Sequence, residues 1–217
     1  MKEMIKVKIC CIQSIEEAQL AIDYGANAIG LVSNMPSGPG VIPDKKIKEI
    51  AEWSKGKINS VLLIALQTPQ AIIEQHNYCK TDFIQLVDSQ KISTYEDIKS
   101  TIPDVKIIQV IHVIDENSVA EANLVSNYVD MILLDSGNPK LKRKKLGGTG
   151  EVHDWQISCE IVNSVNLPIF LSGGLNPDNV TKAVKRVKPY GVDVCSGLRI
   201  NCKLDEQKLK QFVQQLS

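Results

Sequence analysis

The stretch PIFLSGGLNP at residues 168–177 shows the pattern on which the whole chain is built. Its first part is a short apolar run of the kind that forms a buried strand. Gly173 and Gly174 then allow a tight turn, and Asn176 followed by Pro177 has the order of a helix cap and a first helical residue. The stretch therefore predicts a strand, a glycine turn and a helix that begins near Pro177.

Apolar, β-branched runs of this kind recur along the sequence. Most of them are apolar over their whole length instead of alternating, which is typical of parallel strands covered on both faces. The strand candidates are residues 6–11, 28–33, 60–66, 82–87, 105–113, 128–135, 168–173 and 191–197.

Helical patterns lie between these runs. Ser14 and Glu17 have the spacing of a capping box, and Thr68 precedes a proline in the same way as Asn176 does. The remaining helices are predicted at residues 44–55, 94–102, 117–127, 154–165 and 204–216. Strict strand–helix alternation at this length predicts a closed (β/α)8 TIM barrel, since an open doubly wound sheet usually stops at about five to seven strands. No linker interrupts the pattern, so we expect one domain over residues 1–217.

The composition limits the possible partners and location of the protein. Lys plus Arg number 25 and Asp plus Glu number 25, so no net charge attracts nucleic acid or an anionic membrane. The apolar run within residues 1–12 is too short for a signal peptide or a membrane span, and we expect a cytoplasmic protein. The six cysteines lack the CxxC spacing of zinc sites, and most are expected to be thiols, with no bound metal.

Two glycine-containing turns suggest a phosphate site. In a TIM barrel the active site lies at the C-terminal ends of the strands, and the last two loops often hold phosphate. Here these loops contain Gly173-Gly174 and Ser196-Gly197, where missing Cβ atoms let backbone N–H groups approach an anion. Either glycine turn alone is equally well explained by turn geometry, but two in adjacent loops favour the phosphate interpretation.

The sixth loop contains a further glycine-rich segment, Gly147-Gly148-Thr149-Gly150. Its backbone donors predict a segment that closes over a ligand. The preceding residues 140–145 (KLKRKK) either steer an anionic substrate or form the solvated crest of the loop, and the second interpretation is favoured.

Candidate proton-transfer groups stand at strand ends. Cys10 and Asp135 each follow an apolar run, and Lys8 shares a strand face with Cys10, where an ammonium group favours a thiolate base. A buried small hydrophobe is the alternative for Cys10, and a loop cap is the alternative for Asp135. Asp193 is a third candidate, with a structural ion pair to Lys8 as its alternative.

Together and in this order, these residues resemble the phosphoribosylanthranilate isomerase family of the tryptophan pathway, over nearly the whole chain. The resemblance is carried by residues 8–10, 133–136, 147–150, 154–155, 172–175, 179–180, 192–194 and 196–197. It implies an aldose-to-ketose isomerase without a cofactor, in which Cys10 is the general base and Asp135 the general acid. The implied substrate and phosphate contacts are Lys8, Gly147, Gly148, Thr149, Gly173, Gly174, Asp193, Ser196 and Gly197.

The residue types suit that reaction. An acid protonates the furanose ring oxygen so that the ring opens to an iminium, and a base removes the C2 proton to give an enolamine that ketonises. One group must begin protonated and the other deprotonated, so their surroundings must shift the two pKa values in suitable directions.

The chain departs from the family at the aromatic-acid end of the site. Where the family usually has Ser-Pro-Arg, with the Arg facing the anthranilate carboxylate, this chain has residues 37–40 (SGPG), and Asp88 replaces a glycine. If the chain is an active isomerase without that arginine, we expect Arg199 or the basic loop to orient the substrate.

Two alternatives stay open, namely an isomerase or epimerase for another phosphosugar and a non-catalytic phospholigand-binding barrel. We expect a monomer or a homodimer. Smaller departures are Cys11, Glu151, Cys195 and Arg199.

Overall fold

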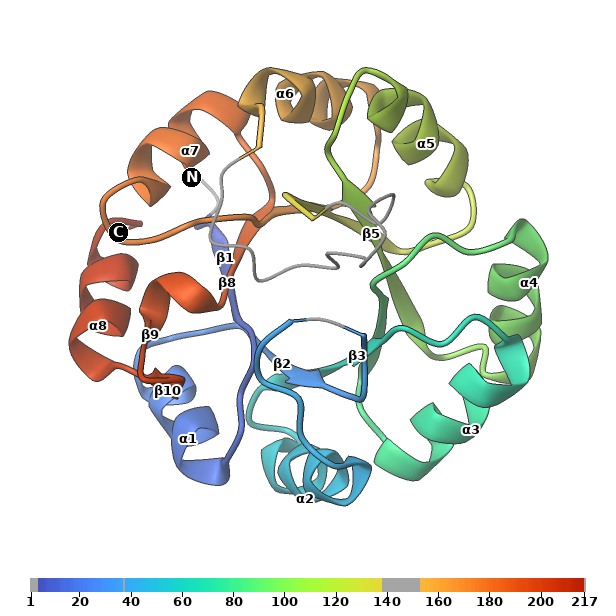
Figure 1. Ribbon diagram of the computed structural model, residues 1–217, viewed down its shortest axis with the longest axis horizontal. Helices are drawn as coiled ribbons and strands as arrows, with labels where there is room; N and C mark the ends of the chain where they lie inside the picture. Colours follow the sequence, from blue (N-terminus) through green and yellow to red (C-terminus); the bar gives the residue numbers. More distant parts are fainter. Residues whose placement is uncertain (1–3, 37, 138–152, 217) are drawn as a thin grey trace.

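The computed structural model describes residues 4–36, 38–137 and 153–216, which form a closed barrel of parallel strands inside a ring of helices (Figure 1). The strands pair in chain order and β8 closes the barrel against β1. The strands are β1 (Lys6–Ile9), β2 (Ala28–Val32), β3 (Asn59–Ile64), β4 (Phe83–Leu86), β5 (Lys106–His112), β6 (Met131–Asp135), β7 (Ile169–Leu171) and β8 (Gly191–Val194). The predicted (β/α)8 TIM barrel is confirmed.

One helix follows each strand on the outside of the barrel (Figure 1). The helices are α1 (Ile15–Asp23), α2 (Asp44–Ser54), α3 (Pro69–Cys79), α4 (Ile92–Thr101), α5 (Asn117–Val125), α6 (Trp155–Ser164), α7 (Val180–Val187) and α8 (Glu206–Gln214). A short 3-10 turn, η1 (Ser196–Leu198), and a small hairpin of β9 (Arg199–Ile200) and β10 (Lys203–Leu204) lie between β8 and α8. In the part of the chain that the structure describes, no helix combines the length and apolarity needed to cross a membrane.

Of the three helix starts predicted from cap signals, two agree with the structure and one differs, and the other predicted starts lie within two residues of those observed. The N–H of Glu17 donates to Ser14 Oγ at 3.3 Å, and α3 begins at Pro69 as predicted. The prediction that a helix starts near Pro177 is wrong, because α7 begins at Val180. Asn176 Oδ1 instead accepts from the N–H of Asp178 at 2.9 Å, and this side-chain turn takes up the residues before the helix.

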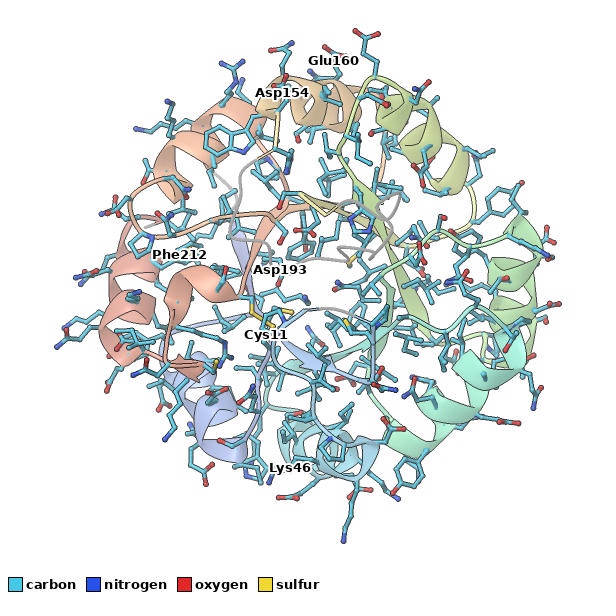
Figure 2. All side chains as sticks on the ribbon, viewed as in Figure 1. Cys11, Lys46, Asp154, Glu160, Asp193 and Phe212 are labelled. Carbon is cyan, nitrogen blue, oxygen red and sulfur yellow. A yellow bond between two sulfur atoms is a disulfide. The ribbon has the colours of Figure 1, made fainter. Side chains whose placement is uncertain are left out.

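The core has two layers, because successive residues of a strand point to opposite faces. Outward-facing side chains pack against the helices, and inward-facing ones such as Val110 and Leu133 fill the barrel. Two residues further along the same strands, the inward positions become His112 and Asp135 at the mouth of the barrel. In Figure 2, Asp193 lies near the barrel axis, whereas charged side chains such as Glu160 lie on the outer rim.

A disulfide joins Cys11 to Cys195 and links the ends of β1 and β8. Most cysteines are thiols as predicted, namely Cys10, Cys79, Cys159 and Cys202, whereas the bond between Cys11 and Cys195 was not predicted. The two half-cystines are 184 residues apart in sequence, yet their Cα atoms lie 5.9 Å apart because β1 pairs with β8.

Candidate active site at the barrel mouth

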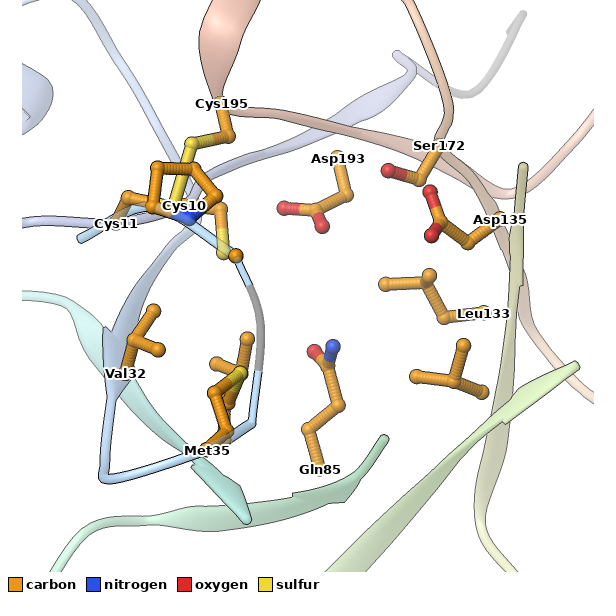
Figure 3. A pocket seen from close by; sticks show the side chains of 14 residues that line it. Cys10, Cys11, Val32, Met35, Gln85, Leu133, Asp135, Ser172, Asp193 and Cys195 are labelled. Atoms are coloured by element: carbon orange, nitrogen blue, oxygen red, sulfur yellow. A yellow bond between two sulfur atoms is a disulfide. The ribbon is translucent and has the colours of Figure 1, made fainter. Parts of the chain in front are cut away.

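A pocket opens at the C-terminal ends of the strands, and Figure 3 shows Cys10 and Asp135 on opposite sides of it with Asp193 between them. Gln85 points up from the floor, and apolar side chains form much of the wall (Figure 3). The lining residues are Cys10, Cys11, Val32, Met35, Gly38, Pro39, Leu63, Gln85, Val110, Leu133, Asp135, Ser172, Asp193 and Cys195.

Cys10 directly follows the last residue of β1, and its N–H donates to Val194 O at 2.8 Å. The thiol is buried, and burial raises its pKa to about 11, although the neighbouring Lys8 ammonium acts in the opposite direction. The predicted effect of Lys8 on Cys10 is therefore present, since the ammonium group favours the thiolate. Burial has the larger effect and favours the thiol. The resulting group is mostly a thiol at neutral pH and, once deprotonated, a strong base.

Lys8 and Asp193 form a buried ion pair, with Lys8 Nζ 2.9 Å from Asp193 Oδ1. Burial alone lowers the pKa of Lys8, but the Asp193 carboxylate raises it above its usual value, so the lysine stays charged. Asp193 lines the pocket, whereas Lys8 lies below it and is only 1% exposed. The ion pair considered for Asp193 is therefore present, and Lys8, predicted as a substrate contact, is not among the pocket-lining residues.

Gly30 of β2 makes room for the cysteine and the lysine. A Cβ atom at this position would lie 2.8 Å from Cys10 Sγ, which is too short, and 3.2 Å from Lys8 Nζ, which is a tight contact. The sequence analysis missed Gly30. A glycine within a strand pattern, which often marks a close approach, was the signal that could have identified it.

Asp135 ends β6 and is only 5% exposed. Its Oδ2 accepts from the N–H of Gly137 at 3.3 Å, so the loop-cap interpretation is correct as far as this contact goes. Two histidines lie near this carboxyl. His112 Nδ1 is 4.0 Å from Asp135 Oδ2, and burial lowers the pKa of His153 to about 4 although Asp135 acts in the opposite direction. Sequence reasoning missed His112, although it ends the apolar run of β5 much as Asp135 ends that of β6.

The two glycine turns meet at the rim of the barrel. Gly173 and Gly174 have φ values of 85° and 63°, which favour glycine. A Cβ at Gly197 would lie only 2.0 Å from Leu175 O, so the second turn is in direct contact with the first. Four backbone N–H groups of these turns donate no hydrogen bond to another described residue. They are those of Gly173, Gly174, Ser196 and Gly197.

Several predicted residues lie outside the described residues. They are the basic run at 140–145, Gly147, Gly148, Thr149, Gly150 and Glu151.

Of the two groups expected to orient the substrate, Arg199 or the basic loop, Arg199 points away from the pocket. Its guanidinium donates to both carboxylate oxygens of Glu17 at 3.1 Å and to the carbonyl oxygens of Cys10, Cys11 and Cys202. These contacts turn the side chain toward α1, and Arg199 is absent from the pocket lining. Arg199 instead holds the backbone of the turn that carries Cys10.

Asp88, the residue that replaces a family glycine, follows β4. It is buried, accepts from the N–H of Ser89 at 3.0 Å and does not line the pocket. Gly38 and Pro39, where the family arginine is missing, do line it. Within the described ranges, no group of three or more His, Cys, Asp or Glu side chains is arranged to hold a metal ion.

Comparisons with known proteins agree over the full length of the barrel. The profile of the family described as N-(5'phosphoribosyl)anthranilate (PRA) isomerase matches residues 7–215. The chain is 32% identical over 214 residues to the N-(5'-phosphoribosyl)anthranilate isomerase of Methanocella arvoryzae, covering 98% of each protein. It is 35% identical over 211 residues to the N-(5'-phosphoribosyl)anthranilate isomerase 2 of Methanosarcina mazei, covering 96% of this chain and 92% of that relative.

Solved structures show the same likeness. The phosphoribosyl anthranilate isomerase of Thermotoga maritima has a TM-score of 0.84 at 28% identity, covering 98% of both chains. A phosphoribosyl anthranilate isomerase in complex with reduced 1-(o-carboxyphenylamino)-1-deoxyribulose 5-phosphate has a TM-score of 0.81 at 25% identity, again covering 98% of both chains.

Proposed function

This chain belongs to the N-(5'-phosphoribosyl)anthranilate isomerase family, and from that premise we propose that Cys10 and Asp135 perform the two proton transfers of its reaction. The protein is an aldose–ketose isomerase of tryptophan biosynthesis that acts on a phosphorylated sugar. The observation that supports the assignment is the placement of a buried thiol and a buried carboxyl on opposite sides of one pocket (Figure 3).

Asp135 acts first, as the general acid. It donates a proton to the furanose ring oxygen while the anilino nitrogen supplies its electron pair to C1, so that the C1–O bond breaks and an iminium forms. The ring oxygen leaves as a hydroxyl group, and the carboxyl becomes a carboxylate. The hydrogen bond from the Gly137 N–H, at 3.3 Å, stabilises that carboxylate.

Cys10 acts second, as the general base. Its thiolate takes the proton from C2, and the electrons of the C2–H bond form the C1–C2 double bond of an enolamine as the iminium nitrogen becomes neutral. The enolamine then ketonises at C2 while C1 takes up a proton. The raised pKa of Cys10 suits this step, because removal of a proton from carbon needs a strong base.

The apolar wall of the pocket suits the aromatic ring of the substrate. Val32, Met35, Leu63 and Val110 line the pocket and offer a surface on which a benzene ring is desolvated without loss of hydrogen bonds. We expect a monomer or a homodimer, and a Thermotoga maritima relative is described as dimeric.

The direct test is turnover by the purified protein. N-(5'-phosphoribosyl)anthranilate should be converted to 1-(o-carboxyphenylamino)-1-deoxyribulose 5-phosphate without added metal or cofactor, as measured by separation of the two compounds. An absence of product, with the aldose still bound, would contradict the proposal and would favour a binding protein.

The glycine turns are proposed to hold the 5'-phosphate, and Gly197→Ala tests this. The new Cβ would lie against Leu175 O, so the turn must shift and its N–H groups no longer point at one anion. Loss of one charge-assisted hydrogen bond costs about 1.5–3 kcal/mol, which corresponds to a rise in KM of about 10- to 100-fold. Steady-state kinetics should show that rise, and inhibition by inorganic phosphate should weaken in parallel.

The control is Gly56→Ala, which lies outside the pocket and where a Cβ meets nothing within 4 Å. The φ of 74° strains alanine there, so the stability of this variant should fall. Gly56→Ala should leave KM and phosphate inhibition unchanged. An equal change in both variants would remove the phosphate assignment.

A further inference from the structure

His112 is a buried ionisable group at the mouth to which the reaction described above gives no task. It is only 6% exposed and ends β5, in register with Asp135 at the end of β6. Val110, two residues earlier, faces the barrel interior, so His112 also faces inward, beside the carboxyl.

The hydrogen bonds of His112 determine which ring nitrogen carries a proton in the neutral imidazole. Nε2 lies 2.9 Å from Val87 O, and a carbonyl oxygen can only accept, so Nε2 is the N–H donor. Nδ1 is buried and forms no hydrogen bond with another described residue. It lies 4.0 Å from Asp135 Oδ2, so it is the only position on the ring where a further proton can be bound, and it faces the proposed general acid.

The other ionisable groups around the carboxyl are already committed. His153, before α6, has its pKa lowered to about 4 by burial and is neutral at neutral pH. Asp193 of β8 is paired with Lys8, and Asp88, after β4, accepts from the N–H of Ser89. Among these groups, His112 is the one with a buried ring nitrogen that has no hydrogen bond to a described residue and faces the Asp135 carboxyl.

We propose that His112 and Asp135 share one proton, so that His112 is the positioning residue that keeps a proton available to the general acid at neutral pH. This inference rests on the proposed role of Asp135. An isolated carboxyl is ionised at neutral pH and has no proton to give, whereas a coupled imidazole–carboxyl pair titrates as a unit with an additional proton near neutrality.

The proton balance of the pair is simple. With one shared proton, the pair is either imidazole and carboxylic acid or imidazolium and carboxylate, and both have zero net charge. From imidazole and carboxylic acid, Asp135 gives its proton directly to the ring oxygen. From imidazolium and carboxylate, the proton first passes from His112 Nδ1 to Asp135 and then to the ring oxygen, and in both cases the pair ends as imidazole and carboxylate. The gap of 4.0 Å is longer than a hydrogen bond, and such catalytic contacts commonly tighten when substrate binds.

His112→Gln tests the inference, because the terminal amide of glutamine can keep the contact to Val87 O but cannot bind a proton. We expect kcat to fall about 10- to 100-fold with KM within about twofold, since general acid catalysis contributes at least this much. The high-pH limb of the kcat profile should also move to lower pH by about one unit or more, because the carboxyl then loses its proton without a partner.

A second measurement needs no variant at His112. The ¹⁵N chemical shift of His112 Nδ1 reports how much of it is protonated, and that fraction at neutral pH should fall in Asp135→Asn, where the carboxyl partner is missing. An unchanged fraction would overturn the inference even if His112→Gln failed to fold.

Two further variants separate the possible outcomes. His76 is buried to a similar degree, at 8% exposure on α3, and His76→Gln should keep the native pH profile. A shift of the limb by His153→Gln instead of His112→Gln would overturn the inference. If His112→Gln has native kinetics and Asp135→Asn is inactive, the shared proton is rejected but Asp135 remains the general acid. If Asp135→Asn is active, the proposed general acid itself is rejected.

Discussion

Replacing Cys10 by serine is expected to lower kcat/KM by about 10³-fold, within the range of about 10² to 10⁴ that proton transfer by a positioned side chain contributes. A hydroxyl group loses its proton far less readily than a thiol, even one whose pKa burial has raised to about 11. Serine is nearly the same size as cysteine, so the fold and the pocket should remain. KM should change little, because the phosphate end of the site is untouched.

Steady-state kinetics on Cys10→Ser and thermal unfolding of the same variant check this result together. The control is Cys79→Ser on α3, a buried thiol whose pKa is raised to about 12 by burial and which lies outside the pocket. It should keep native kinetics although its stability falls. Native turnover in Cys10→Ser would mean that another group removes the C2 proton.

Replacing Asp135 by asparagine is expected to cost about as much, about 10²- to 10⁴-fold in kcat. Asparagine has the shape of the protonated carboxyl and can donate a hydrogen bond to the ring oxygen, but it cannot transfer a proton to it. Ring opening should therefore become limiting, while the phosphate turns still bind substrate. The measurement is kcat and KM for the aldose, with phosphate inhibition as a check on binding.

Asp88→Asn is the matched control, since Asp88 is equally buried at 5% exposure and follows β4 but does not line the pocket. Its kcat should stay within a few-fold of the native value. A similar loss in both variants would mean that the effect comes from the charge of the mouth as a whole instead of from the acid at Asp135.

The turn that carries the base shows how the chain accommodates a departure from its family. Cys11 stands where the family usually has glycine, and its φ of 64° lies in the left-handed region, which costs a non-glycine residue about 1–2 kcal/mol. Three contacts hold it there, namely the disulfide to Cys195, the bond from Arg199 to its carbonyl oxygen and the close packing of Gly40, whose Cβ would lie 2.4 Å from that of Cys11. The cost of a left-handed backbone at Cys11 is therefore offset by contacts from the end of β8, from β9 and from the loop after β2.

Much of the site could be predicted from the sequence because strand ends are local features. Alternating strand and helix patterns predicted the barrel, and the barrel places every strand's C-terminal end at one mouth. Cys10, Asp135 and the two glycine turns were identifiable for that reason. Helix starts were less secure, as α7 shows, because Asn176 can cap a helix or form a side-chain turn with equal local preference.

The sequence by itself determined the number and order of the strands, the barrel and the residues at its mouth, since each follows from patterns within a few residues. Only the tertiary structure decided which of those residues touch. The Lys8–Asp193 pair spans 185 residues and the Arg199–Glu17 pair 182, and both exist because β8 closes against β1. The pairing of His112 with Asp135 likewise depends on the register between β5 and β6, which is set by the packing of the whole barrel and not by either strand alone.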